Sequence, residues 1–226
     1  MASLQTIELS ATDAPAATVI VLHGLGADGT DFLPFADELK LNAVGPVRWV
    51  SPRAPVRPVT INGGQPMRAW YDVRGTELQR RAGANEDDAG LRESFALVHA
   101  LLDREVARGV PAKRIVLAGF SQGCAITLGA GLRYGQALAG LAGMSGYLPL
   151  ADTTAAERVA ANAQTPVFLA HGTRDPVVVL QRGTESRDAL QALGQPLEWH
   201  DYPMEHSVCI EEVAALRSWL LRVLAA

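Results

Sequence analysis

The stretch Arg114-Ile-Val-Leu-Ala-Gly-Phe-Ser-Gln-Gly123 decides the fold of this chain. Its first half is a short apolar run typical of a buried strand, and residues 122–133 are nearly all small or apolar, which predicts a buried helix. Gly119 and Gly123 flank Ser121 in a GxSxG pattern, which lets a strand turn sharply into a helix and exposes the serine hydroxyl. In this strand–turn–helix setting the pattern predicts a nucleophilic serine rather than a structural turn with an incidental one.

Apolar runs of this kind alternate with helical patterns along the chain. The clearest helical spacing runs from Leu91 to Val106, with Asn85 as the expected N-cap and Gly109 and Pro111 as the stop. The alternation predicts an α/β fold, a mostly parallel central sheet with helices on both faces. The other expected strands are 18–22, 47–50, 138–142, 167–170 and 197–202, and further helices are expected at 181–193 and 213–223.

Two stretches depart from the alternation. Residues 51–81 contain four prolines and three glycines, and residues 148–163 are rich in Ala and Thr. Neither is long enough to be a domain, so residues 1–226 are expected to form a single domain. Because irregular segments of α/β sheets gather near the ligand crevice, residues 51–81 are expected to form a small lid or flap over the site.

Composition excludes several classes of protein. With 48% hydrophobic and 19% charged residues the chain is neither disordered nor fibrous. Its 20 basic and 24 acidic residues argue against a nucleic-acid partner. No apolar run is long enough for a stable membrane insertion, and the first ten residues lack a signal-peptide pattern, which predicts a cytoplasmic protein. Two cysteines predict neither a disulfide framework nor a metal site.

A nucleophilic serine needs a histidine base, and the base needs an orienting carboxylate, in the chain order Ser, acid, His for this topology. His206 is the expected base because it follows the last strand in a loop, where its ring can reach the end of the sheet. His200 lies within a strand pattern, and His171 precedes the expected acid. We therefore interpret both as structural residues.

Asp175 is the expected acid. It lies just past the end of strand 167–170, where catalytic groups collect in open α/β sheets. Asp152, Asp188 and Asp201 are weaker candidates, since they fall in an irregular segment, on a helix and within a strand, respectively.

Two backbone N–H groups are needed to bind the developing oxyanion. Gln122, which follows the nucleophile, is one expected donor, and Leu25, in the glycine-rich loop after the first strand, is the other. The same loop offers a rival interpretation, because Gly24, Gly26 and Gly29 spell the GxGxxG pattern of dinucleotide sites. That site also requires an acidic residue at the end of the next strand, where this sequence has none, so no cofactor is predicted.

Four further residues bear on the site. Met67 and Trp70, both in the flap, are expected to line an acyl groove, although a structural role for Trp70 is equally open. Cys124 is a rival nucleophile, but it lies three residues into the buried helix and is expected to be a packed small side chain. Cys209 is expected to be a helix residue.

These residues resemble the carboxylesterase and acyl-protein thioesterase family of α/β-hydrolases, in its bacterial esterase branch. The resemblance runs from His23 to the last helix. It rests on His23-Gly-Leu-Gly26 with Asp31-Phe32, Pro52-Arg-Ala-Pro55, Met67-Arg-Ala-Trp-Tyr-Asp72, Gly119-Phe-Ser-Gln-Gly-Cys124, Met144-Ser-Gly-Tyr-Leu-Pro149, His171-Gly-Thr-Arg-Asp-Pro-Val-Val178 and Tyr202-Pro-Met-Glu-His206.

The resemblance implies a triad at Ser121, Asp175 and His206, cofactor-free hydrolysis of small-molecule esters or thioesters, a small lid and a homodimer. Two departures from the family pattern stand out: Val179 replaces a usual proline, and Glu205 replaces a common glycine beside the base. We expect a serine carboxylesterase acting on short to medium acyl esters through a Ser121 acyl-enzyme. The alternatives are an acyl-protein thioesterase, a lysophospholipase and, outside the enzymes, a catalytically silent binding protein with the same fold.

Overall fold

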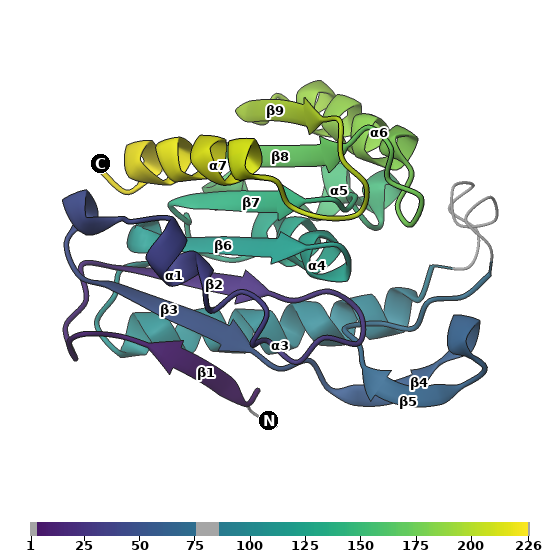
Figure 1. Cartoon of the computed structure of the whole chain (residues 1–226), viewed down its shortest axis with the longest axis horizontal. Helices are drawn as coiled ribbons and strands as arrows, with labels where there is room; N and C mark the ends of the chain where they lie inside the picture. Colours follow the sequence, from purple (N-terminus) through teal and green to yellow (C-terminus); the bar gives the residue numbers. More distant parts are fainter. Residues whose placement is uncertain (1–3, 76–85, 226) are drawn as a thin grey trace.

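A computed structural model describes residues 4–75 and 86–225. Within these residues a seven-stranded sheet crosses the molecule in the order β1-β3-β2-β6-β7-β8-β9 (Figure 1). The edge strand β1 is antiparallel to β3, and every other neighbouring pair is parallel. The strands are β1 (Thr6–Leu9), β2 (Ala17–Leu22), β3 (Val47–Pro52), β6 (Ile115–Phe120), β7 (Gly140–Met144), β8 (Val167–Gly172) and β9 (Leu197–Tyr202).

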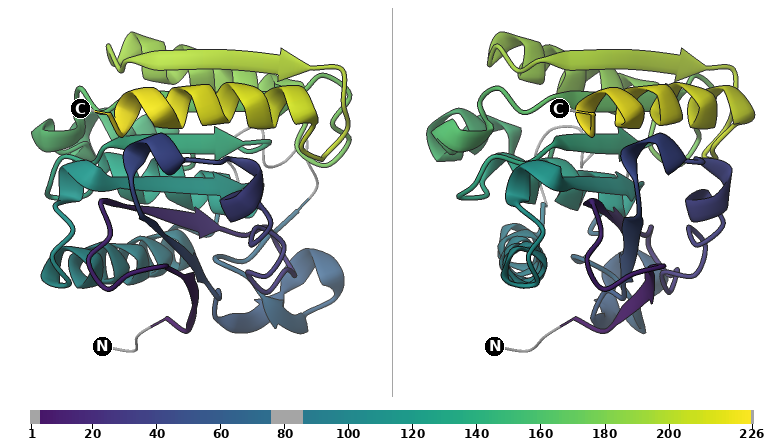
Figure 2. Two further views of the ribbon diagram at one scale, coloured as in Figure 1. Left: turned by 60° about the vertical axis from the view of Figure 1, so that its left-hand side comes forward. Right: turned by 90° about the vertical axis from the view of Figure 1, so that its left-hand side faces the viewer.

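Helices cover both faces of the sheet, which confirms the predicted α/β architecture (Figure 2). One face packs against α3 (Asp88–Ala107), α4 (Gln122–Leu132) and α6 (Leu180–Ala192), and the other against α1 (Phe35–Glu38) and α7 (Ile210–Val223). Strands β2, β7 and β8 are buried at every position, because a parallel sheet has two covered faces. Short 3₁₀ turns occupy Asn42–Val44, Thr60–Asn62, Ala112–Arg114 and Ala160–Asn162.

The long helix α3 follows the predicted apolar stripe. Leu91, Phe95, Val98 and Leu102 are buried on its inner face. Its N-cap is Asp87, whose side chain accepts a hydrogen bond from a backbone N–H in the first turn. The expected cap, at position 85, lies outside the described residues.

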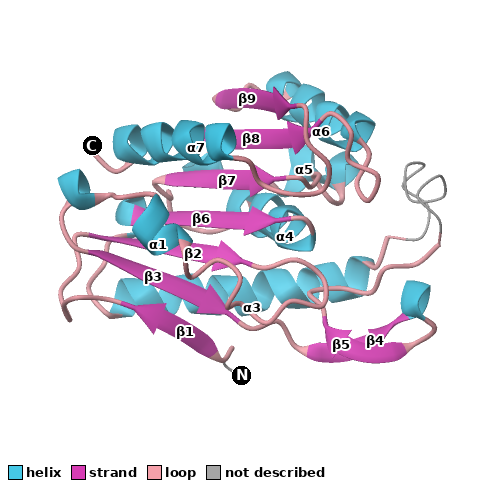
Figure 3. Cartoon of the chain, viewed as in Figure 1, coloured by secondary structure: helices cyan, strands magenta, loops and turns pink. Residues whose placement is uncertain are grey.

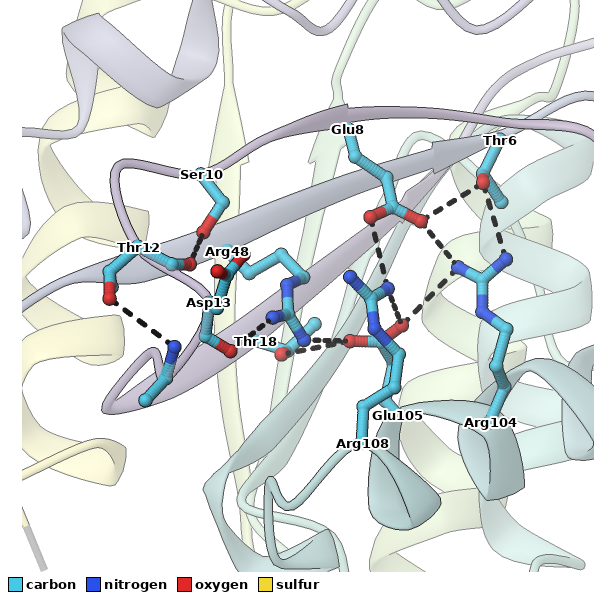
Figure 4. A network of polar contacts seen from close by, with 11 residues as sticks. Thr6, Glu8, Ser10, Thr12, Asp13, Thr18, Arg48, Arg104, Glu105 and Arg108 are labelled. Atoms are coloured by element: carbon cyan, nitrogen blue, oxygen red, sulfur yellow. Dashed lines mark hydrogen bonds and ion pairs between the residues drawn. The ribbon is translucent and has the colours of Figure 1, made fainter.

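A charge network with a buried centre connects the edge strand β1 to α3 (Figure 4). Arg48 and Glu105 form an ion pair at 3.0 Å, with 2% and 0% of their side chains exposed. Arg104 and Arg108 each contact both Glu105 and Glu8 of β1. The Glu105 carboxylate is thus buried but surrounded by cations, the condition that makes a buried charge tolerable.

The expected flap is more ordered than predicted (Figure 3). Its first residues complete β3, and a two-stranded hairpin follows, formed by β4 (Val56–Val59) and β5 (Gln65–Arg68). Pro58 and Pro66 stand opposite each other in this hairpin, which two edge strands tolerate but a central strand would not. Because proline in a run argues against a strand, the sequence pattern did not predict β4 and β5. Residues 76–81 of the expected flap lie outside the described residues.

Other differences from expectation include a missed helix, a missed strand and a shifted strand boundary. The stretch 148–163 was expected to be irregular but contains α5 (Ala151–Glu157). The short, half-exposed β1 gave too weak a periodic signal to be predicted. Strand β7 begins two residues later than position 138. No helix in the described ranges is long and apolar enough to cross a membrane.

Candidate active site

Ser121 occupies a strained turn at the carboxyl end of β6. Its backbone has φ 56° and ψ −118°, in the positive-φ region that costs energy for a residue with a side chain. A Cβ atom on Gly119 would overlap the backbone of Gly123, and one on Gly123 would overlap the carbonyl of Leu22. The glycines of the motif therefore permit close approach of α4 to the sheet, while Ser121 itself takes the unfavourable backbone angles.

The three predicted triad residues meet at this edge of the sheet. His206 Nε2 lies 2.9 Å from Ser121 Oγ, and His206 Nδ1 lies 2.7 Å from Asp175 Oδ2. The second oxygen, Asp175 Oδ1, accepts hydrogen bonds from the N–H groups of Val177 at 2.8 Å and Val178 at 2.9 Å. Because the carboxylate accepts the Nδ1 proton, Nε2 of a neutral ring is left without a proton and faces the serine.

Asp175 is held in its ionised form. Burial alone would raise its pKa, but the hydrogen bonds from His206 and from the Val178 and Val177 N–H groups keep the pKa below its usual value. His171 contacts the same loop, which carries Asp175 and Val178. Its Nε2 lies 2.7 Å from the Val178 carbonyl and 3.7 Å from Asp175 Oδ2, and burial lowers its pKa, so a neutral ring donates to that carbonyl. His171 is thus a support of the acid loop.

The rival histidine and carboxylates are engaged elsewhere. The His200 ring contacts the Glu198 side chain. Asp152 accepts a hydrogen bond from the Thr153 N–H, and Asp188 forms an ion pair with Arg187. Asp201 accepts a hydrogen bond from the Trp199 indole. Glu205, the residue beside the base, is exposed.

Two backbone N–H groups next to Ser121 are free to bind an oxyanion. The N–H of Gln122 opens α4, where the first turn of a helix has no acceptor of its own. Leu25 lies in the loop after β2, held by hydrogen bonds from Gly26 N to Arg68 O and from Ala27 N to Gly24 O. Within the described part of the chain, neither the Leu25 nor the Gln122 N–H donates to a protein acceptor.

Sequence reasoning missed two side chains that brace this site. Gln122 donates to the Tyr71 carbonyl and accepts from the Trp70 N–H, both at 2.8 Å, and so ties α4 to the segment after β5. His23 is fully buried, and its Nε2 accepts from the Ala54 N–H at 3.0 Å while Nδ1 faces the Gly24 carbonyl at 2.7 Å. In the sequence, only the positions of His23 and Gln122 beside the two glycine-rich motifs pointed to such a role.

A cavity of about 240 Å³ opens beside Ser121. Its lining residues come from the loops at the carboxyl edge of the sheet, from the 3₁₀ turn after β4 and from α6: Leu25, Ile61, Tyr71, Val73, Ser121, Gln122, Tyr147, Val177, Val178 and Arg182. Met67 and Trp70, the expected groove residues, are not among them. The Trp70 indole is fully buried and donates to the His23 carbonyl at 2.9 Å, so the structure gives it a place in the core.

Neither cysteine lines the cavity beside Ser121. Cys124 is fully buried beneath the turn, and burial raises its pKa well above the usual value, which disfavours the thiolate. Cys209 is the N-cap of α7, one residue before the helix in which it was expected, and burial raises its pKa as well.

The mostly parallel sheet and the serine on its strand–helix turn, followed along the chain by an aspartate and a histidine, define an α/β-hydrolase. The family model described as phospholipase/carboxylesterase matches residues 5–224. The chain belongs to this family, as its motifs predicted, and is a carboxylic ester hydrolase.

The names of similar proteins agree with this class. The chain is 38% identical over 218 residues to acyl-protein thioesterase 1 of Yarrowia lipolytica, covering 95% of each sequence. The crystal structure of Arabidopsis thaliana SOBER1 matches with a TM-score of 0.86 and 32% identity, over 92% of this chain and 99% of that one. The structure of Zea mays acyl-protein thioesterase 2 matches with a TM-score of 0.85 and 30% identity, over 97% and 99%.

Proposed function

We propose that this protein is a serine carboxylesterase that transfers short to medium acyl groups to Ser121 and then to water. The observation that carries the proposal is the continuous hydrogen-bonded chain from Ser121 Oγ through His206 to Asp175, with distances of 2.9 and 2.7 Å. The cavity of about 240 Å³ is smaller than the ~300–1,000 Å³ typical of sites for drug-sized ligands, which favours acyl groups of limited length.

Each group in the site has a role in this reaction. His206 Nε2 accepts the proton of Ser121 as its oxygen attacks the ester carbonyl, and the N–H groups of Leu25 and Gln122 stabilise the oxyanion that forms. His206 then gives the proton to the departing alcohol, and a water molecule repeats the sequence on the acyl-enzyme. Asp175 stabilises the imidazolium in both halves of the reaction.

A second candidate function is S-acyl thioester hydrolysis. It is favoured by the 38% identity, over nearly the whole chain, to a relative named acyl-protein thioesterase. The same residues serve both reactions, because an ester and a thioester form the same acyl-enzyme. Lysophospholipid hydrolysis, a homodimer and a cytoplasmic location stay predictions from the sequence.

The test compares the kcat of Ser121→Ala and Cys124→Ser on three substrates: p-nitrophenyl butyrate, a butyryl thioester and a lysophospholipid. We expect Ser121→Ala to lose at least about 10³-fold in kcat on every substrate that the protein hydrolyses, while Cys124→Ser keeps most of the activity. The wild-type ratios of kcat/KM rank the three activities. An active Ser121→Ala variant would overturn the proposed nucleophile.

A further inference from the structure

The cavity beside Ser121 is apolar at its mouth and polar at its inner end. Ile61 and Val177 are 49% and 52% exposed and form part of the rim. Tyr71, Tyr147 and Arg182 line the same cavity but are only 5%, 7% and 7% exposed. An acyl chain that fills the cavity from Ser121 therefore meets these three buried polar side chains beside buried apolar ones such as Val178.

The two tyrosine hydroxyls have one proton for which the described residues offer no acceptor. Tyr71 and Tyr147 lie hydroxyl to hydroxyl at 2.8 Å. Burial raises the pKa of both, so each keeps its proton at neutral pH. One hydroxyl donates to the other, and no further acceptor for the second proton occurs among residues 4–75 and 86–225. The pair is thus a hydrogen-bond donor open to the cavity.

Arg182 adds further N–H donors beside this pair. Its guanidinium lies over the Tyr147 ring, 3.3 Å from the ring centre. The carboxylate that pairs with it, Glu86 Oε1, is 3.6 Å away, beyond hydrogen-bond distance, and Glu86 Oε2 is taken up by the Leu150 N–H. The Tyr147 hydroxyl accepts a side-chain hydrogen bond from Arg182. A guanidinium carries several N–H donors, so others of its N–H groups have no acceptor among the described residues.

We propose that the inner end of the cavity selects acyl groups that carry an oxygen acceptor, such as a keto oxygen, over plain alkyl chains. The proposal rests on the proposed esterase function and names its substrate class. A plain alkyl chain would displace water from these donors and leave them unpaired, whereas an oxygen at the right position restores a hydrogen bond. One hydrogen bond to such donors is worth about 1.4 kcal/mol, which predicts roughly a tenfold preference in kcat/KM.

The experiment measures kcat/KM for p-nitrophenyl heptanoate and for its 4-, 5- and 6-oxo derivatives. We expect at least one oxo ester to be preferred over heptanoate by about tenfold or more. The preference should fall to near one in the double variant Tyr71→Phe/Tyr147→Phe and decrease severalfold in Arg182→Met. The readout for each variant is kcat/KM for an oxo ester divided by kcat/KM for heptanoate, so a general loss of rate does not affect it.

Tyr134→Phe is the matched control, because its hydroxyl donates to Asp103 at 2.7 Å and the residue does not line the cavity. It should keep the wild-type ratio. A wild-type ratio near one at all three positions would overturn the inference while hydrolysis of heptanoate still supports the esterase function. A preference that survives both cavity variants would overturn the assignment of the donors. If the double variant does not fold, Arg182→Met decides alone.

Discussion

Replacing Glu212 with glutamine should make the protein more stable at neutral pH. Glu212 lies in the first turn of α7 and is 0% exposed, and no side chain of the described residues donates a hydrogen bond to its carboxylate. Burial raises its pKa from 4.5 to about 8, and the nearby Cys209 N–H offsets only part of this. The folded protein therefore holds this carboxyl protonated at neutral pH, whereas the unfolded chain ionises it.

The magnitude follows from these two values. Between pH 4.5 and about 8 the folded state binds one proton more than the unfolded state, so the free energy of unfolding falls by about 1.4 kcal/mol per pH unit. The stabilising contribution is complete below pH 4.5 and is lost as the pH rises through 8. At pH 7, about 2.5 units above the usual pKa, the loss is on the order of 3 kcal/mol. Glutamine does not ionise, so the variant does not show this pH-dependent loss of stability.

Urea unfolding of wild type and Glu212→Gln at pH 5.5, 6.5 and 7.5 measures this difference. The gap between the two proteins should widen with pH in favour of the variant, and any constant cost of the amide cancels from the slope. Glu211→Gln is the control: Glu211 is exposed in the same helical turn, so its replacement should leave the pH dependence close to that of wild type. Parallel pH profiles for wild type and Glu212→Gln would refute the reasoning.

Three further predictions concern the site and its supports. Asp175→Asn should lower kcat/KM by roughly 10²–10⁴, as known for the equivalent change in a serine protease, because the amide favours the wrong tautomer of the base. The control Asp201→Asn should keep kcat/KM within about fivefold of wild type, and the reverse order would show that Asp175 is not the orienting acid. Glu105→Gln should destabilise the fold by about 3–5 kcal/mol, since the buried Arg48 loses its partner, and an unchanged urea midpoint would contradict this. Gly123→Ala should lower both activity and thermal stability, because the added methyl meets the backbone of β2; equal melting temperatures would rule out the close approach.

The sequence alone predicted the parallel sheet and pointed to Ser121 and His206, the nucleophile and base that we propose. Apolar runs identify strands that are buried on both faces, since burial sets the residue pattern locally. The GxSxG turn identified Ser121 because its strand and helix are contiguous in the chain. The topology of parallel strands then placed Asp175 and His206 at the same edge, and the structure brings both within hydrogen-bond distance.

The tertiary structure alone decided what surrounds these residues. Trp70 was a candidate for the groove, but only the packing of the chain shows that its indole is used in the core and that the neighbouring Tyr71 faces the cavity. The polar inner end joins Tyr71 after β5, Tyr147 after β7 and Arg182 on α6, three positions with no shared sequence pattern. Local periodicity encodes which face of an element is buried, whereas the contacts between distant elements depend on how their side chains fit together, and that is why the shape and polarity of the cavity emerged only from the folded chain.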